Sequence, residues 1–321
     1  MDQKLARGFA RSLLRSIAPL GDLQNGPLSK SLKGIMQDYL DGSIPAGRLV
    51  TRGFELHSQL AKAGSCPTTC EIIRHPTRKR ILVGNVRPVV IDGAEQDWLV
   101  CASTLFDLGR DELVMVETVA HIAISQHTLA RLFERGRFQD DNLTDLMDIT
   151  TLWAVPLLQV MNRTGFKVGT EVAIPFMNGL LLGTLEVNPI EPDQGPTAAT
   201  ISRGRVRPEH LDPAFGTIGK GVMAIGINTY IGAQELFENQ QDLLQAFEGF
   251  EKAFRPEMQV LRDGMMKGLP DSRMVERFGE VLEVVGSDDL VALAGTLERF
   301  FGTPEWRTHA EAHCRPKRFL H

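Results

Sequence analysis

The sequence lacks the features that mark secreted and membrane-spanning proteins. Its 321 residues include only four cysteines, too few for a disulfide scaffold, so a reducing cytoplasm is the expected compartment. No apolar run approaches the roughly 18 residues that cross a bilayer. Residues 1–17 are basic and amphipathic but lack the continuous apolar core of a secretory signal. We therefore expect a cytoplasmic protein with no membrane partner and a soluble N-terminal helix.

An excess of positive charge is absent as well. The formal net charge is -5 and the pI is about 5.9. No global basic field therefore draws the chain to nucleic acid, and an anionic partner must be met by a local patch. The 43% hydrophobic and 23% charged content is ordinary for a globular protein.

The common catalytic and metal-binding motifs are also missing. Residues 216–221, GTIGKG, differ from a phosphate-binding loop because glycine follows the lysine and a strand, not a helix, is expected next. Neither GxSxG nor HExxH occurs. Cys66 and Cys70 have a spacing found in zinc sites, but no pattern brings further ligands to them. We predict no metal ion and no cofactor, although more ligands of the right type lie near the C-terminus: His309, His313 and Cys314.

Hydrophobic periodicity divides the chain into three regions. Residues 1–65 have helical spacing, residues 66–232 combine strand alternation with helical stretches, and residues 233–321 are helical with a basic tail. Short turns between successive strands of the middle region imply antiparallel pairing. The sequence therefore predicts an α+β fold, with a central, mostly antiparallel sheet and packed helices, flanked by helical N- and C-terminal regions.

Local signals place the elements more finely. Asn178-Gly179 is a strong hairpin signal between strands expected at 171–177 and 180–187. Residues 189–213 are rich in proline and glycine, and we expect a long loop there. The other expected elements are helices at 28–40, 47–63 and 143–161, the last kinked at Pro156, strands at 71–75, 80–83, 87–91, 98–106 and 221–231, and several helices after 233 with breaks at glycines and prolines.

The stretch 112–135 carries the best site candidate. Apolar and other residues alternate strictly up to Ser125, which predicts a half-buried strand. The period then becomes helical, and Ser125 is a suitable N-cap. His127, Arg131 and Arg135 are four residues apart and so share one helical face. His121 lies on the preceding strand.

These side chains have the chemistry needed to bind or cleave a phosphodiester. Two arginines on one face can bind a phosphate with bidentate hydrogen bonds, and a histidine can move a proton near neutral pH. A hydroxyl from Thr229 or Tyr230 could position the phosphate. The alternative is a solvated helix face on which Arg131 or Arg135 pairs with nearby acids. We expect three further arginines to reach the anion from the 189–213 loop: Arg203, Arg205 and Arg207.

The segment 125–135, SQHTLARLFER, resembles the His–Arg–Arg helix of small bacterial toxin-like domains. The order strand, helix, helix, hairpin, strand over 112–231 is similar to the metal-independent ribonuclease superfamily of barnase-like and RelE-like toxins. This resemblance implies an endoribonuclease in which His127 is catalytic, Arg131 and Arg135 contact phosphate, and Thr229 or Tyr230 supplies a hydroxyl.

Two other classes of function remain open. A non-catalytic α+β binding or scaffold protein would have its site residues scattered and would offer an apolar patch on the C-terminal helices to a protein partner. A nucleotide-using transferase would use the same arginines on a pyrophosphate, together with a carboxylate such as Glu117 or Glu186. Catalysis on RNA requires His127, Arg131 and Thr229 to meet in one cleft.

Overall fold

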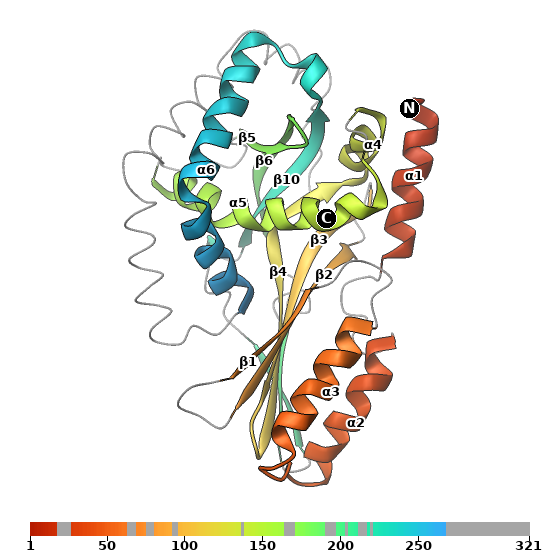
Figure 1. Cartoon of the computed structure of the whole chain (residues 1–321), viewed down its shortest axis with the longest axis vertical. Coiled ribbons are helices and arrows are strands. Elements are labelled where there is room, and N and C mark those ends of the chain that lie inside the picture. The colour runs from red at the N-terminus through yellow and green to blue at the C-terminus, as the bar shows by residue number, and fades with distance from the viewer. Residues whose placement is uncertain are drawn as a thin grey trace.

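The computed structural model describes residues 1–17, 27–62, 69–74, 80–91, 96–135, 138–163, 171–189, 197–202, 205–210, 217–218 and 221–267. Within them the chain forms six α-helices and one mixed sheet (Figure 1). The predicted α+β class, with a mostly antiparallel sheet and helices packed on it, is confirmed.

The sheet follows the path β1-β2-β3-β4-β10-β6-β5, with β7 beside β4, β8 beside β7 and β9 beside β10. All pairs are antiparallel except β4 with β10. The strands are β1 (Thr69–Arg74), β2 (Ile81–Ile91), β3 (Trp98–Leu108), β4 (Glu112–Ser125), β5 (Glu171–Phe176), β6 (Gly179–Pro189), β7 (Thr197–Ser202), β8 (Arg205–His210), β9 (Thr217–Ile218) and β10 (Gly221–Ile231).

The long strand β4 divides the molecule into two parts. One edge pairs with β3 along most of its length. The other edge pairs with β7 over Glu112–Glu117 and with β10 over Ile122–Ile124. The β10 end carries α1, α4, α5 and α6, whereas α2 and α3 lie at the β7 end (Figure 1). These helices are α1 (Gln3–Ser16), α2 (Pro27–Asp41), α3 (Leu49–Lys62), α4 (Gln126–Arg135), α5 (Leu143–Arg163) and α6 (Glu238–Lys267), with short 3-10 turns η2 (Asp140–Asn142) and η3 (Ala233–Glu235).

Two separate hydrophobic cores fill these parts. The larger core joins α1, α4, α5 and α6 to the upper sheet and includes Trp153, Leu129 and Phe247. The smaller core joins α2 and α3 to the lower halves of β2, β3 and β4, with Tyr39 and Phe106 fully buried. The N-terminal helices therefore serve different cores, because α1 packs on α4 and the following pair packs on the far end of the sheet.

The predicted hairpin at Asn178-Gly179 is present, but its turn is one residue earlier than expected. Met177 and Asn178 form the two-residue turn, with φ of 48° and 59°. Left-handed values at both positions match the turn that suits the twist of paired strands. Gly179 is the first residue of β6, where an added Cβ would lie 2.3 Å from the carbonyl oxygen of Ile231. The glycine is required there by close backbone approach.

The prediction of a long loop at 189–213 is wrong over the part that the structure describes. Thr197–Ser202 and Arg205–His210 pair as an antiparallel hairpin, and β7 adds to the free edge of β4. Ile201 is fully buried in the smaller core. Pairing of an otherwise open strand edge and burial of Ile201 outweigh the local proline and glycine signals.

Two further boundaries differ from the prediction. The strands expected at 80–83 and 87–91 form one strand, β2, which pairs with β3 throughout. The helix break expected before residue 257 is absent, since α6 runs through Pro256. Phe250 before the proline and Met258 after it are both buried in the larger core, so tertiary packing holds the helix together despite the missing N–H. The helices expected beyond 267 lie outside the described residues.

Candidate functional site

The position of α4 is fixed by polar contacts where β4 ends. The Ser125 Oγ accepts a hydrogen bond from the Thr128 backbone N–H at 3.0 Å, which confirms the predicted N-cap. The Thr128 hydroxyl donates to the Ile227 carbonyl oxygen on β10 at 2.8 Å. These groups are buried, so the rotation of α4 on the sheet is set. Its apolar residues enter the core, and its half-buried outer face carries His127, Arg131 and Arg135.

Burial and neighbouring positive charges both act on His127. Burial is the main cause that lowers its pKa, followed by the positive charge of Arg131. Arg7 on α1 and Arg135 lower the pKa further, and Glu134 acts in the opposite direction. Each nearby cation penalises the protonated imidazole. Both causes favour the neutral form of the His127 imidazole.

Both arginines of α4 already have acidic partners. Arg131 Nη1 contacts Glu134 Oε2 at 2.8 Å, the pairing that the solvated-face interpretation expected. Arg135 Nη1 contacts Glu235 Oε2 of η3 at 2.6 Å. The Nε of Arg131 is nevertheless buried with no hydrogen-bond partner in the described part of the chain. One donor of this guanidinium is thus unsatisfied and shielded from solvent.

The hydroxyls of β10 do not form an open site beside His127. The Tyr230 side chain is fully buried, and its Oη donates to the Met177 carbonyl oxygen at 3.1 Å. Burial, and then the charge of Glu235, raises the pKa of Tyr230 to about 12. Thr229 is only 6% exposed. Tyr230 therefore supports the turn between β5 and β6, and neither hydroxyl is free to meet a ligand at the surface.

Arg205 of the β7–β8 hairpin does not join this site. Arg205 is exposed and pairs in register with Ser202, which pairs with Glu112 at the start of β4. A strand of this length rises about 40 Å between Glu112 and Ser125. Arg205 is thus at the opposite end of the sheet from α4. Arg207 lies in β8 and His121 in β4, but neither side chain is described, and Arg203 lies outside the described residues.

The described ranges contain no candidate metal site, and two hollows of their surface lie away from α4. No group of three or more His, Cys, Asp or Glu side chains there could hold a metal ion. Cys70 lies in β1, whereas Cys66, His309, His313 and Cys314 lie outside those ranges. Two shallow hollows of about 410 and 210 Å³ lie around Asp41–Ser43, at the end of α2. Neither hollow is lined by His127, Arg131 or Thr229, which catalysis would require to meet in a cleft.

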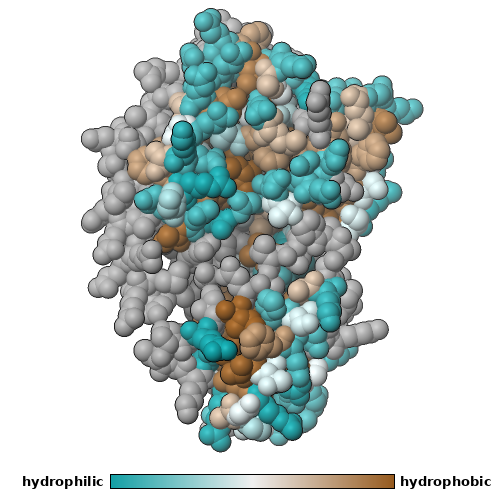
Figure 2. All heavy atoms as spheres, in the orientation of Figure 1, coloured by the Kyte–Doolittle hydropathy of each residue, from teal (hydrophilic) through white to brown (hydrophobic). Residues whose placement is uncertain are grey.

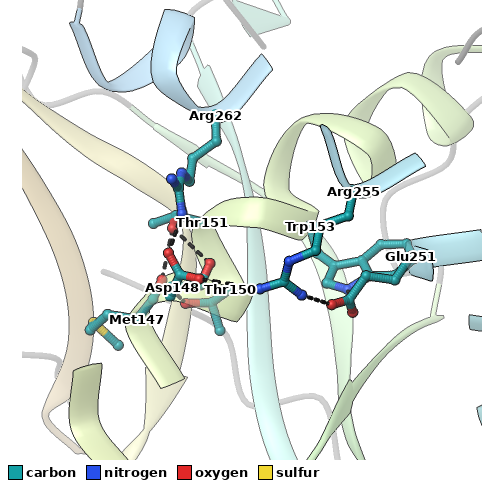
Figure 3. Close-up of polar contacts among 8 residues, drawn as sticks. All are labelled: Met147, Asp148, Thr150, Thr151, Trp153, Glu251, Arg255 and Arg262. Carbon is teal, nitrogen blue, oxygen red and sulfur yellow. Dashed lines mark hydrogen bonds and ion pairs between the residues drawn. The ribbon is translucent and has the colours of Figure 1, made fainter. Parts of the chain in front are cut away.

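A second charged cluster joins α5 to α6 (Figure 3). Arg255 pairs with Glu251 on its own helix and lies 3.9 Å from Asp148 on α5. Arg262 also pairs with Asp148. The indole N–H of Trp153 donates to Glu251 at 3.3 Å. These bonds cross from α5 to both sides of Pro256, so the cluster ties the two helices together.

Two residues that no local pattern predicted also act on the α4 cluster: Arg7 of α1 and Glu235 of η3. The charge of Arg7 acts on His127 because α1 packs on α4, with Phe9 stacked on Phe133 at 5.7 Å between ring centroids. A signal was available, since residues 1–17 are basic in an acidic chain. Only the packing of α1 shows where that charge lies.

Comparison with models of protein families, with curated proteins and with solved structures found no match to the chain. Among the described helices, none combines the length and apolar character needed to cross a membrane.

Proposed function

We propose that the protein binds a phosphate-bearing ligand, with RNA as the favoured class, on the surface formed by α1 and α4. The observation that carries this proposal is the position of His127 among Arg7, Arg131 and Arg135, whose charges lower its pKa. The charges of three arginines act on this imidazole against that of one glutamate, so positive charge predominates there on a chain whose net charge is -5. Guanidinium groups match phosphate oxygens in geometry and charge.

The charge balance within this cluster supports an anionic ligand. Glu134 and Glu235 each pair with one arginine of α4. Arg7 is exposed and has no ion pair with any described residue, and Arg131 Nε has no acceptor. A phosphate that binds at the surface would gain a charge-assisted hydrogen bond from the exposed Arg7 without displacing either glutamate, whereas the Arg131 Nε is shielded from solvent.

The second candidate is metal-independent cleavage of RNA, and the lowered pKa of His127 favours it. A neutral imidazole can accept the proton of a ribose 2′-hydroxyl, and Arg131 can stabilise the charge that develops on the phosphate. Cleavage also needs an acid that protonates the leaving oxygen. Tyr230 cannot serve as this acid, because its hydroxyl donates to the Met177 carbonyl oxygen. Binding is therefore the primary proposal, and cleavage is tested beside it.

The direct test is fluorescence anisotropy with a labelled RNA at low and moderate salt. We expect Arg7→Glu to weaken binding about tenfold. The slope of log affinity against log salt concentration should fall by about the amount that one phosphate contact contributes. Arg48→Glu is the matched control, because this exposed arginine of the α3 end carries the same charge change far from α4. Failure of the wild type to bind RNA at low salt, or equal losses in both variants, would overturn the proposal.

The protonation of His127 gives an independent readout. Bound phosphate offsets the charges of the three arginines, so the pKa of His127 should rise when inorganic phosphate or RNA is added. Imidazole resonances in an NMR titration measure this change, and His127→Gln identifies the signal. Incubation of the same protein with RNA and a chelator tests cleavage. Products that disappear in His127→Gln would assign the proton transfer to His127, and products that persist would exclude it.

A further inference from the structure

The outer face of α1 combines exposed cations with exposed apolar side chains. Leu5 is 54% exposed and Phe9 is 45% exposed, although both lie on a helix that packs into the larger core. Figure 2 shows hydrophobic atoms on the surface over this helix, at the upper right, next to hydrophilic ones. Four basic residues of α1 are also exposed and have no ion pair with any described residue: Lys4, Arg7, Arg11 and Arg15.

Helical geometry places the cations and the apolar side chains on opposite sides of the exposed face of α1. At about 100° per residue, the four basic residues fall on one side of the exposed face, and Leu5 and Phe9 fall on the other. Gly8 and Ser12 lie between the two groups, and a Cβ added at Gly8 would meet no atom within 4 Å. Arg7 is the basic residue that extends the row toward His127. Gly8 and Ser12 therefore separate the apolar side chains from the row of cations, and this row leads to the site on α4.

The ring of Phe9 is held from behind. Its plane makes an angle of 29° with that of Phe133, and the ring centroids are 5.7 Å apart. Phe133 is fixed in turn by an edge contact with Phe138 at 5.2 Å, and both of these rings are buried. One face of Phe9 is thus occupied by a rigid aromatic stack, while nearly half of the side chain stays open to solvent.

We propose that α1 is a platform for single-stranded RNA, on which an unpaired base stacks against Phe9. From there the backbone crosses Gly8 and Ser12 to the row of cations and reaches Arg7 beside His127. This inference rests on the proposed function and names its substrate class. An exposed, supported aromatic ring next to unpaired cations is the arrangement that binds single strands, because every base offers a π-face and every nucleotide a phosphate.

The strand must be single because stacking on Phe9 needs a base that has left its own stack. In a duplex the bases are paired, and the protein can reach only the backbone and groove edges. A duplex should therefore bind through the cations alone. Preference for the single strand, and its dependence on the ring of Phe9, are the two properties that distinguish this platform from a general basic surface.

The test compares a labelled 12-nucleotide RNA with a duplex of the same sequence by fluorescence anisotropy. Phe9→Ala should weaken binding of the single strand about tenfold and leave the duplex unchanged. Phe9→Leu keeps the apolar contact with Phe133 but has no π-face, so it should lose most of the same affinity. Phe9→Trp should retain binding, and its indole fluorescence should be quenched when the single strand binds. Phe54→Ala is the matched control, because Phe54 is 53% exposed on α3, in the other part of the molecule.

The outcomes separate this inference from the proposed function. If Arg7→Glu weakens binding but Phe9→Leu does not, the platform is wrong and the phosphate site on α4 stands. If the wild type binds no RNA, both fall. Sedimentation with vesicles of anionic phospholipid provides the remaining arm. Vesicle binding that depends on Phe9, together with RNA binding that does not, would assign the face to a bilayer surface and overturn the inference.

Discussion

Two helix pairs cover the larger core, and they use arginine in different ways. Between α5 and α6, Arg255 and Arg262 are matched by Glu251 and Asp148, and the charges hold the helices to each other (Figure 3). Between α1 and α4, cations exceed acids, and several have no partner in the described residues. The first arrangement is satisfied internally, whereas the second leaves exposed cations, which an anion would match under the proposed function.

The aromatic residues of the two pairs differ in the same way. Trp153 is fully buried against Phe247, with ring centroids 4.9 Å apart, and its N–H is bonded to Glu251. Phe9 also has an aromatic neighbour, but it remains 45% exposed. Burial and bonding indicate a structural role for Trp153, and exposure leaves Phe9 available to a ligand. Substitutions in the two pairs should therefore separate stability from binding.

The largest expected effect is on stability at the α5–α6 pair. Trp153→Ala removes a buried ring and a hydrogen bond, so the free energy of unfolding should fall by about 3–5 kcal/mol. Denaturant unfolding followed by circular dichroism measures this loss. A change below about 1 kcal/mol would show that α6 contributes little to the larger core.

A smaller loss is expected when the charged link between these helices is cut. Asp148→Ala removes the partner of Arg262 and Arg255 and should cost about 1 kcal/mol, since these side chains are partly exposed. RNA affinity should not change, because the cluster lies away from α4. An affinity loss in a folded Asp148→Ala protein would contradict the division between the two helix pairs.

A pH-dependent effect of smaller size is expected at His127. Its pKa is lowered from 6.5 by burial and by neighbouring arginines, so the unfolded chain binds this proton more readily than the folded protein. The contribution of His127 to stability is complete above pH 6.5 and is lost as the pH falls through the lowered pKa of the folded protein. His127→Gln should therefore flatten the decline in unfolding free energy between pH 7.5 and 5.5. An unchanged slope would place His127 in an unperturbed environment.

The smallest effect on stability is expected at Phe9. Phe9→Leu should change the free energy of unfolding by no more than about 0.5 kcal/mol, because the side chain is half exposed and the substitution keeps its apolar contact. Thermal unfolding beside the RNA titration checks both properties in one protein. A large loss of stability would make Phe9 a core residue, like Trp153.

Short-range signals predicted much of the fold. The change of period at Ser125 placed both β4 and α4 within a residue of their observed bounds, since side-chain direction follows backbone geometry. Predictions failed where distant contacts outweighed local preference. The β7–β8 hairpin exists because β4 offers a free edge, and α6 passes through Pro256 because core packing continues beyond it. Neither the free edge of β4 nor the core that α6 packs against can be inferred from the local sequence of these segments.

The sequence by itself determined the spacing of His127, Arg131 and Arg135, because a helix of fixed pitch puts residues four apart on one face. It also determined that any anion must meet a local patch, since the whole chain is acidic. Tertiary structure alone decided that Arg7 joins His127, that Tyr230 is locked against Met177, and that Arg205 lies at the far end of the sheet. Charge and pitch are properties of a segment, whereas proximity between segments depends on which apolar faces pack together and which strand edges pair.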